Sequence, residues 1–268
     1  MAEADPTKAP WALILGASSG FGEAASIALA RAGFHVFGVH LDRKATLANV
    51  ERIETEIRAS GGQAVFFNVN AADPAKRGEV ISAMRERVAE PPGTVRVFMH
   101  SLAFGALRPL ISTDSDRALS DREITMTLDV MANSLVYWTQ DLVVARLLEP
   151  GARVFAMTSA GDVHAWPSYG AVSAAKCALE AYCRQLALEL APRGISVNAL
   201  RAGVTDTPAL RKIPGSDVML EASLKRNPSG RLTLPTDVAG AIVALSQPGA
   251  GWITGNVIGV DGGEEVAT

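Results

Sequence analysis

Short apolar runs alternate with helical patterns along the whole chain, and this order constrains the fold more than any other feature. The runs expected as strands are residues 11–15, 34–41, 64–69, 95–100, 153–157, 195–200 and 256–260. The helical patterns between them include residues 23–32, 45–60, 126–148, 171–190 and 237–246. Alternation at this spacing favours right-handed β-α-β units. We therefore predict an α/β fold: a doubly wound, mostly parallel sheet with helices on both faces.

The composition fits one domain of this kind. The 268 residues are 48% apolar and 20% charged, which excludes a disordered chain. The net charge of −3 provides no basic field to recruit nucleic acid or an anionic membrane. No apolar run approaches the roughly 20 residues that span a bilayer, and no secretory signal is recognisable. We expect a cytoplasmic protein with residues 1–10 as a flexible N-terminus and residues 11–268 as a single domain.

The cysteines and histidines predict neither a disulfide scaffold nor a metal site. Cys177 and Cys183 lie six residues apart in an apolar helical stretch, which is typical of buried or half-buried small side chains. The four histidines do not share a metal-ligand spacing. His164 is expected either to line a pocket or to lie on the surface.

Residues 204–234 interrupt the alternation of strands and helices. This segment is long and contains three prolines together with charged residues, Leu and Met. Because it follows a strand, it should lie over the carboxyl edge of the sheet, where ligands of such folds bind. Long ordered loops in compact domains are usually functional, so we interpret the segment as a substrate lid.

A glycine-rich turn connects the first strand to the first helix: Gly16-Ala17-Ser18-Ser19-Gly20-Phe21-Gly22. Glycines allow a tight turn and let backbone N–H groups approach a pyrophosphate, to which the helix N-terminus adds its positive dipole. A turn needed only for packing is the alternative. In this strand–turn–helix context, the motif predicts a dinucleotide-binding, Rossmann-type domain.

The spacing Gly-x-x-x-Gly-x-Gly resembles the fingerprint of the short-chain dehydrogenase/reductase family, and the resemblance covers essentially the whole chain. Asn70-Ala71 stands where that family packs the adenine, residues 100–105 stand where it usually has Asn-Asn-Ala-Gly, and Asp261-Gly262-Gly263 matches its C-terminal signature. The resemblance implies a nicotinamide cofactor. It assigns cofactor contacts to Gly16, Ser18, Ser19, Gly20, Phe21, Gly22, His40, Arg43, Lys44, Asn70, Ala71, Ser101, Leu102, Ala103, Tyr169, Lys176, Gly203, Val204 and Thr207.

The end of the second strand decides between NAD and NADP. An acidic side chain there accepts a hydrogen bond from the ribose 2′-hydroxyl, whereas basic groups hold a 2′-phosphate. His40 occupies the place where NAD-using relatives tend to carry Asp, and Arg43 and Lys44 follow. These two cations favour NADPH, unless they are ordinary surface charges. Asp42 leaves NADH as the alternative.

Tyr169 and Lys176 are the residues on which the predicted activity depends. Tyr169 lies between the fifth strand and a helix that carries Lys176, and six residues separate the two. Most short-chain reductases separate this pair by three residues, and Val172 stands at the corresponding position here. The six-residue interval, like the sequence at 100–104, resembles the enoyl–acyl-carrier-protein reductase branch of the family.

Two further positions bear on this resemblance. Met131 falls where ordinary carbonyl reductases usually place a catalytic Asn, and Asn133 offers an alternative alignment two positions away. Ser159 lies 17 residues before Lys176, the separation at which other reductases carry their catalytic Ser. The better-known enoyl reductases tend to have an aromatic hydroxyl residue there. A serine resembles the subgroup nearest to ordinary short-chain reductases, often described as NADPH-dependent.

The chemistry of C=C reduction gives a reason for the displaced tyrosine. Hydride delivered to the β-carbon of an unsaturated thioester leaves negative charge on the thioester oxygen, as an enolate. Moving Tyr back about one helical turn relative to Lys shifts the proton donor towards that oxygen. The resemblance implies that Tyr169 stabilises and protonates the enolate, and that Lys176 holds the nicotinamide ribose and strengthens Tyr169 as a donor. Ser159 would support the oxyanion or orient the nicotinamide; a structural hydroxyl is the alternative.

The start of the lid and two aromatic residues complete the candidate site. In the resembling family, a backbone amide and a hydroxyl after Gly203 contact the nicotinamide carboxamide, which points to Val204 and Thr207. Thr207 is alternatively a cap for the short helix that begins at Pro208. Trp166 and Phe104 are candidate apolar walls for an acyl chain, and Phe104 is equally a candidate for the core.

These features predict an NADPH-dependent reductase of trans-2-enoyl thioesters, carried on acyl-carrier protein or CoA, in fatty-acid elongation. A short-chain carbonyl reductase is the first alternative, and a non-catalytic dinucleotide-binding protein is the second. The resemblance also implies a homotetramer built on the helices at 126–148 and 171–190. An acidic carrier protein would need a basic rim, for which the candidates are Arg108, Arg201, Arg211, Lys212, Lys225 and Arg226; ordinary solvated charges are the alternative.

Overall fold

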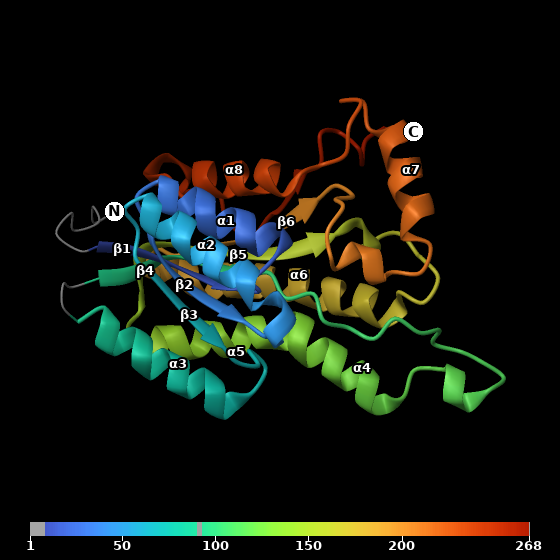
Figure 1. The fold of residues 1–268 in the computed structure, drawn as a ribbon, viewed down its shortest axis with the longest axis horizontal. Coiled ribbons are helices and arrows are strands. Elements are labelled where there is room, and N and C mark those ends of the chain that lie inside the picture. The colour runs from blue at the N-terminus through green and yellow to red at the C-terminus, as the bar shows by residue number, and fades with distance from the viewer. Residues whose placement is uncertain (1–8, 90–92, 268) are drawn as a thin grey trace.

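A seven-stranded sheet runs through the centre of the computed structural model, which describes residues 9–89 and 93–267 (Figure 1). The strands are β1 (Ala9–Leu15), β2 (His35–His40), β3 (Ala64–Asn68), β4 (Gly93–His100), β5 (Leu148–Ser159), β6 (Ser196–Ala202) and β7 (Val257–Val260). Their order is β3-β2-β1-β4-β5-β6-β7, and every pairing is parallel. The chain reverses its direction across the sheet between β1 and β4, so the predicted doubly wound sheet is confirmed.

Helices cover both faces of this sheet. They are α1 (Gly20–Arg31), α2 (Leu47–Ala59), α3 (Pro74–Arg87), α4 (Asp121–Leu128), α5 (Ser134–Val144), α6 (Gly170–Leu190), α7 (Ser216–Arg226) and α8 (Pro235–Leu245). α1 packs between α2 and α8 on one face, while α3, α5 and α6 lie on the other. Each face has its own apolar core, one around Trp11, Phe98 and Trp138 and the other around Ile14 and Phe155. Burial of both faces explains why the strands read as nearly continuous apolar runs.

The helix predicted at 126–148 is wrong at both ends. A reciprocal capping box between Ser120 and Glu123 starts α4 five residues earlier, at Asp121. A π-helical turn (η3, Asp129–Asn133) then separates α4 from α5. Arg146 adopts a left-handed conformation with φ +57, which ends the helix and leads into β5. These ends are set by backbone capping, which an apolar pattern does not register.

Two helices, α3 and α7, were not among the predicted elements. Asp73 starts α3 by accepting hydrogen bonds from the N–H groups of Ala75 and Lys76, and Pro74 occupies the first helical position. α7 lies within the predicted lid. The expected flexible N-terminus is corrected in part, because residues 9–10 belong to β1; residues 1–8 lie outside the described part of the chain.

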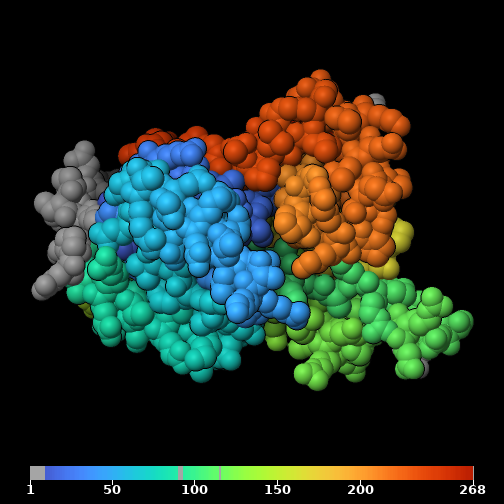
Figure 2. Space-filling model, in the orientation of Figure 1, coloured from blue at the N-terminus to red at the C-terminus, as the bar shows by residue number. Residues whose placement is uncertain are grey.

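Two segments project at the carboxyl ends of the strands. Residues 204–234, which include α7, lie above this edge, and residues 101–120 extend below it (Figures 1 and 2). Both lie at the end of the molecule opposite the start of β1. Among the helices within residues 9–89 and 93–267, none has the length and apolarity needed to cross a bilayer.

Candidate active site

The glycine-rich turn between β1 and α1 has no room for a side chain at Gly16 or Gly22. Gly16 has φ +83 and Gly20 has φ +56, a conformation that favours glycine. A Cβ atom on Gly16 would clash with the carbonyl oxygen of Ser101, and one on Gly22 would clash with the carbonyl oxygen of Gly16. Ser19 precedes α1 without making a side-chain cap. The backbone N–H groups of the first helical turn of α1 therefore face the glycine-rich segment, as an anion-binding site requires.

Two distant segments border the same turn. The Ser101 N–H donates to the Leu15 carbonyl oxygen at 3.0 Å, which brings the end of β4 beside β1. A Cβ atom built on Gly20 would lie 3.5 Å from Thr207 Cγ2, so the start of the lid adjoins the turn from the other side. The structure thus brings together residues 16–22, 101–102 and 207, which the sequence separates widely.

A carboxylate stands at the end of β2 beside the glycine turn. Asp42 Oδ2 lies 2.9 Å from Nδ1 of the buried His40. Partial burial opposes ionisation of Asp42, but hydrogen bonds from Ser18, Thr46 and His40 outweigh it and lower the pKa of the carboxyl group. Asp42 is therefore ionised at neutral pH and already engaged within the protein.

The other predicted residues around the adenosine end are exposed, except Ala71. Arg43 and Lys44 lie on the surface after β2. Asn70 Oδ1 accepts the backbone N–H of Ala72 at 3.0 Å. Ala71 is buried, and its carbonyl oxygen accepts the indole N–H of Trp138. Their contacts with a cofactor remain predictions.

Ser159, Tyr169 and Lys176 meet where β5 gives way to α6. Ser159 ends β5, Tyr169 is the residue before α6, and Lys176 lies within α6. Seven residues amount to about two helical turns, so Tyr169 and Lys176 share one face of the helix about 10 Å apart along its axis. A Cβ atom on Gly161 would lie 2.5 Å from Tyr169 Cε1 and 3.3 Å from Ser159 Oγ, so the phenol ring and this hydroxyl border the same glycine.

Burial sets the protonation of these groups. Burial raises the pKa of Tyr169, and the neighbouring Ser159 hydroxyl offsets part of this effect. Ser159 Oγ is itself buried, with no hydrogen-bond partner among the described residues. Burial lowers the pKa of Lys176 to about 8, while the nearby Cys183 and Glu180 act in the opposite direction. At neutral pH, the Tyr169 hydroxyl thus keeps its proton and Lys176 is an ammonium group.

Met131 and Asn133 face different surroundings. Met131 is buried, and its sulfur lies 2.9 Å from the place a Cβ atom on Gly105 would take. Asn133 accepts a hydrogen bond from the Tyr182 hydroxyl and donates one to Asp129. Of the two, Met131 therefore faces the segment that follows β4, while the polar groups of Asn133 are used between α6 and η3.

The lid is attached to the C-terminal segment through Glu264. The buried Glu264 carboxylate accepts the backbone N–H of Val204 at 3.1 Å and lies 2.9 Å from Arg226 Nη2. Thr207 Oγ1 accepts the N–H of Leu210 at 3.2 Å, although the short helix begins at Leu210 rather than Pro208 and has Ala209 as its N-cap. The predicted carboxamide contact of Val204 therefore competes with Glu264 for one N–H group.

The three residues proposed to line a pocket lie at the edge of the site. The Trp166 indole N–H donates to the Pro214 carbonyl oxygen at 2.9 Å, which joins the loop before Tyr169 to the lid. The Phe104 side chain is exposed rather than part of the core. His164 is exposed and lies 3.0 Å from Glu265. The core alternative for Phe104 is therefore wrong, and Trp166 contacts the lid directly.

The predicted basic rim is largely neutralised. Four of its six residues form ion pairs: Arg108 with Glu123, Arg201 with Asp162 and Glu180, Arg211 with Asp206, and Arg226 with Glu264. Arg201 in particular is half-buried, so it is not a rim residue.

The expectation for the cysteines also needs correction, because Cys177 is exposed whereas Cys183 is buried.

Sequence reasoning missed three buried acidic residues: Asp162, Glu180 and Glu264. A signal existed for Glu180, which stands four residues after Lys176 and therefore on the same helix face. Glu264 directly follows the Asp-Gly-Gly signature. Nothing in the sequence indicates that Asp162 meets Arg201.

A doubly wound parallel sheet with a phosphate-binding turn and a Tyr–Lys pair after β5 defines a Rossmann-type oxidoreductase. The chain belongs to the short-chain dehydrogenase/reductase family: residues 16–265 match a family model described as Enoyl-(Acyl carrier protein) reductase. Enzymes of this family use a nicotinamide cofactor. The glycine turn fits such a group, because no side chain can stand at Gly16 or Gly22 and α1 begins directly within it, so a pyrophosphate can approach the backbone at the helix N-terminus.

Similar proteins carry different activities. One relative, a 1-cyclohexenylcarbonyl-CoA reductase from Streptomyces collinus, is 32% identical over 94% of this chain and 85% of its own length. A 3-oxoacyl-acyl-carrier-protein reductase from Thermotoga maritima is 27% identical over 94% of this chain and 96% of its own. A short-chain dehydrogenase from Burkholderia cenocepacia, solved in complex with NADP, superimposes with a TM-score of 0.79 at 26% identity, covering 97% of this chain and all of its own.

Proposed function

We propose that this oxidoreductase uses NADPH to reduce the C=C bond of trans-2-enoyl thioesters in fatty-acid elongation. The observation that carries the proposal is the position of Tyr169 at the start of α6, two helical turns before Lys176. This position differs from that of the ketone-reducing members, in which one turn separates the pair. It suits a donor that must reach the thioester oxygen rather than the carbon that accepts hydride.

The nicotinamide supplies the hydride, and the protein's own residues manage charge and protons. Backbone N–H groups at residues 18–22 would hold the pyrophosphate, since those of Gly16 and Ala17 donate to the Val39 carbonyl oxygen. Lys176 orients the ribose hydroxyls and favours negative charge nearby. Tyr169 donates its hydroxyl proton to the thioester oxygen as that oxygen gains charge, and Ser159, whose hydroxyl is unpartnered among the described residues, supplies a second donor.

The preference for NADPH is supported by Arg43 and Lys44, which are exposed after β2, and by the engagement of Asp42 with His40. Replacing both cations by Ala should raise KM for NADPH about tenfold or more, the size expected for losing charge-assisted bonds to a phosphate. KM for NADH should stay unchanged. An equal effect on both cofactors would remove the two cations from cofactor selection.

A ketone reductase is the second candidate, favoured by Ser159 at the position that ketone-reducing relatives use and by the 27% identity to a 3-oxoacyl reductase. Cofactor oxidation with crotonyl thioesters and with acetoacetyl thioesters separates the two. Higher kcat/KM on the crotonyl compound supports enoyl reduction, and higher kcat/KM on the acetoacetyl compound overturns it. Comparison of CoA and acyl-carrier-protein thioesters identifies the carrier.

The proposal extends to a cytoplasmic homotetramer that buries outer faces of α5 and α6. Tyr137 and Val144 on α5 and Leu188 on α6 are exposed in the single chain, which is compatible with such contacts. Light scattering at micromolar concentration measures the assembly. A monomeric mass would contradict this part of the proposal without affecting the chemistry.

A further inference from the structure

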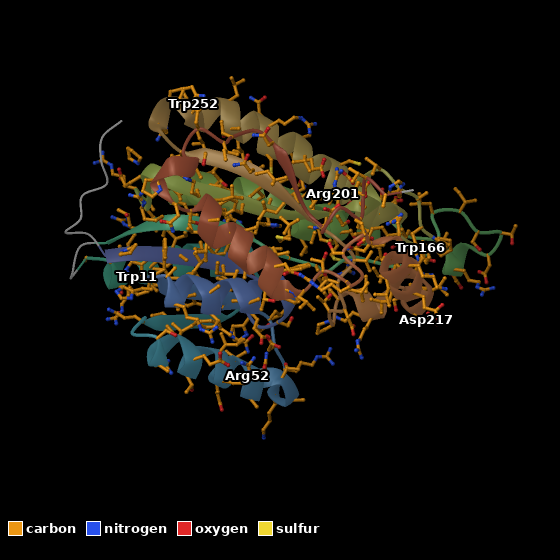
Figure 3. The ribbon with its side chains drawn as sticks, turned by 90° about the horizontal axis from the view of Figure 1, so that it is seen from above. Trp11, Arg52, Trp166, Arg201, Asp217 and Trp252 are labelled. Atoms are coloured by element: carbon orange, nitrogen blue, oxygen red, sulfur yellow. The ribbon has the colours of Figure 1, made fainter. Side chains whose placement is uncertain are left out.

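A buried ion cluster lies beside the candidate catalytic residues. Arg201 Nη2 is bonded to the Asp162 carboxylate and lies 3.3 Å from Glu180 Oε1. The Thr158 hydroxyl donates to the same Glu180 oxygen at 2.8 Å. The side chains of Asp162 and Glu180 are 4% and 10% exposed, and that of Arg201 is 20% exposed. Figure 3 shows Arg201 towards the end of the molecule that carries Trp166 and the lid.

Each member of the cluster adjoins a residue of the site. Thr158 directly precedes Ser159, and Asp162 closes the short turn (η4, Ala160–Asp162) that follows it. Glu180 stands one helical turn after Lys176 on α6. Arg201 lies on β6 in register with Thr158. The cluster therefore holds the Ser159 backbone from both sides and attaches it to the helix of Lys176.

The charges of the cluster are not matched one to one. Two carboxylates face a single guanidinium, and burial together with the neighbouring Asp162 raises the pKa of Glu180. Further titratable or charged groups around Glu180 are Lys176, Cys183 and Arg184, all on α6. The Lys176 ammonium, four residues before Glu180 on α6, supplies a second positive charge next to this pair of carboxylates.

We propose that Arg201 is a positioning residue that, with Asp162 and Glu180, fixes the turn bearing Ser159 against the helix bearing Lys176. Only the activity measurements below rest on the proposed function. The stability measurements require no substrate and test the cluster by themselves.

The shared contact of the two carboxylates with Arg201 is tested by a double-mutant cycle. Glu180→Gln and Asp162→Asn each leave Arg201 with one carboxylate, whereas the double variant leaves it without either. The double variant should therefore lower Tm by far more than the sum of the two single variants. Additive shifts in Tm would overturn the cluster. A double variant that fails to fold beside two folded singles also supports it.

Positioning is tested with Arg201→Lys, which keeps the charge but loses the fork that reaches both carboxylates. Its kcat should fall about tenfold or more, as expected for a small misplacement of catalytic groups, with KM for the cofactor unchanged. The matched control is Arg211→Lys, at an exposed ion pair with Asp206, which should leave kcat unaltered. Wild-type kcat in Arg201→Lys would refute the positioning role.

The pH dependence of kcat/KM provides a readout that a purely structural role would not move. Arg201→Met removes the positive charge that offsets Glu180, whose carboxylate raises the pKa of Lys176, so the alkaline limb should move up by about half a pH unit. Asp162→Asn/Glu180→Gln removes the negative charge and should move the limb down. If the alkaline limb shifts in the same direction in both variants, or does not shift in Arg201→Met, the cluster is not coupled to Lys176.

Discussion

The Lys176 ammonium donates a hydrogen bond of 2.7 Å to the backbone carbonyl oxygen of Met157. Met157 lies two residues before Ser159 on β5, so this bond joins the helix that carries the lysine to the strand that carries the serine. Lys176 is 6% exposed, and burial lowers its pKa to about 8. The ammonium therefore titrates within a range that ordinary assays reach.

This pKa predicts an alkaline limb in the activity profile. As pH rises through about 8, Lys176 loses its proton, and kcat/KM should fall. The effect on stability has the opposite sign. The unfolded lysine keeps its proton up to a pKa of 10.5, so between about 8 and 10.5 the unfolded state binds more protons and the free energy of unfolding rises with pH. A limb centred near pH 10 would show that Lys176 is not the titrating group.

Tyr169→Phe should abolish most of the turnover. It removes the proposed proton donor, which in general acid catalysis contributes about 10² to 10⁴ in rate. Cofactor affinity, measured by fluorescence titration, should be retained because the ring remains. Tyr182→Phe is the matched control, since its hydroxyl bonds Asn133 rather than the site. Similar kcat in the two variants would remove Tyr169 from the chemistry.

Gly22→Ala should destabilise the protein strongly, because the added methyl group meets the Gly16 carbonyl oxygen. We expect a loss of more than about 2 kcal/mol in the free energy of unfolding, together with loss of cofactor binding. Gly240→Ala, in the exposed face of α8 with nothing within 4 Å of its new Cβ, should instead gain about 0.5 to 1 kcal/mol. Urea unfolding of both variants checks this contrast.

His100 should make the protein sensitive to acid. It is fully buried, its Nε2 lies 2.8 Å from Ser134 Oγ, and burial with the nearby Lys176 lowers its pKa from 6.5 to about 3. As pH falls below 6.5, the imidazole binds a proton in the unfolded state, whereas in the native state it stays neutral down to about pH 3. Stability should then fall by up to about 1.4 kcal/mol per pH unit.

Urea unfolding of His100→Gln between pH 4 and 7 tests this assignment. The variant should have a flatter stability profile on the acid side, while replacement of the exposed His164 by Gln should leave the wild-type slope. An unchanged slope in His100→Gln would assign the acid sensitivity to other groups.

Local sequence patterns determined the sheet and the cofactor turn. The strands were predicted because burial on both faces selects continuous apolar runs, and the turn because a strand, three glycines at fixed spacing and a helix follow one another directly. The spacing of Tyr169 and Lys176 is also local, since seven residues along one helix fix their relation before any tertiary contact forms; their roles stay predictions.

Only the tertiary structure decided which charged residues meet. Asp162 and Arg201 are 39 residues apart and belong to a turn and a neighbouring strand, and Glu264 reaches Val204 from 60 residues away. Sequence reading placed Arg201 on a basic surface because an isolated Arg is usually solvated. Its burial follows from the register of β5 with β6, which no local pattern specifies. Residue spacing determines short-range structure, whereas ion pairing between distant segments depends on how the whole sheet aligns them.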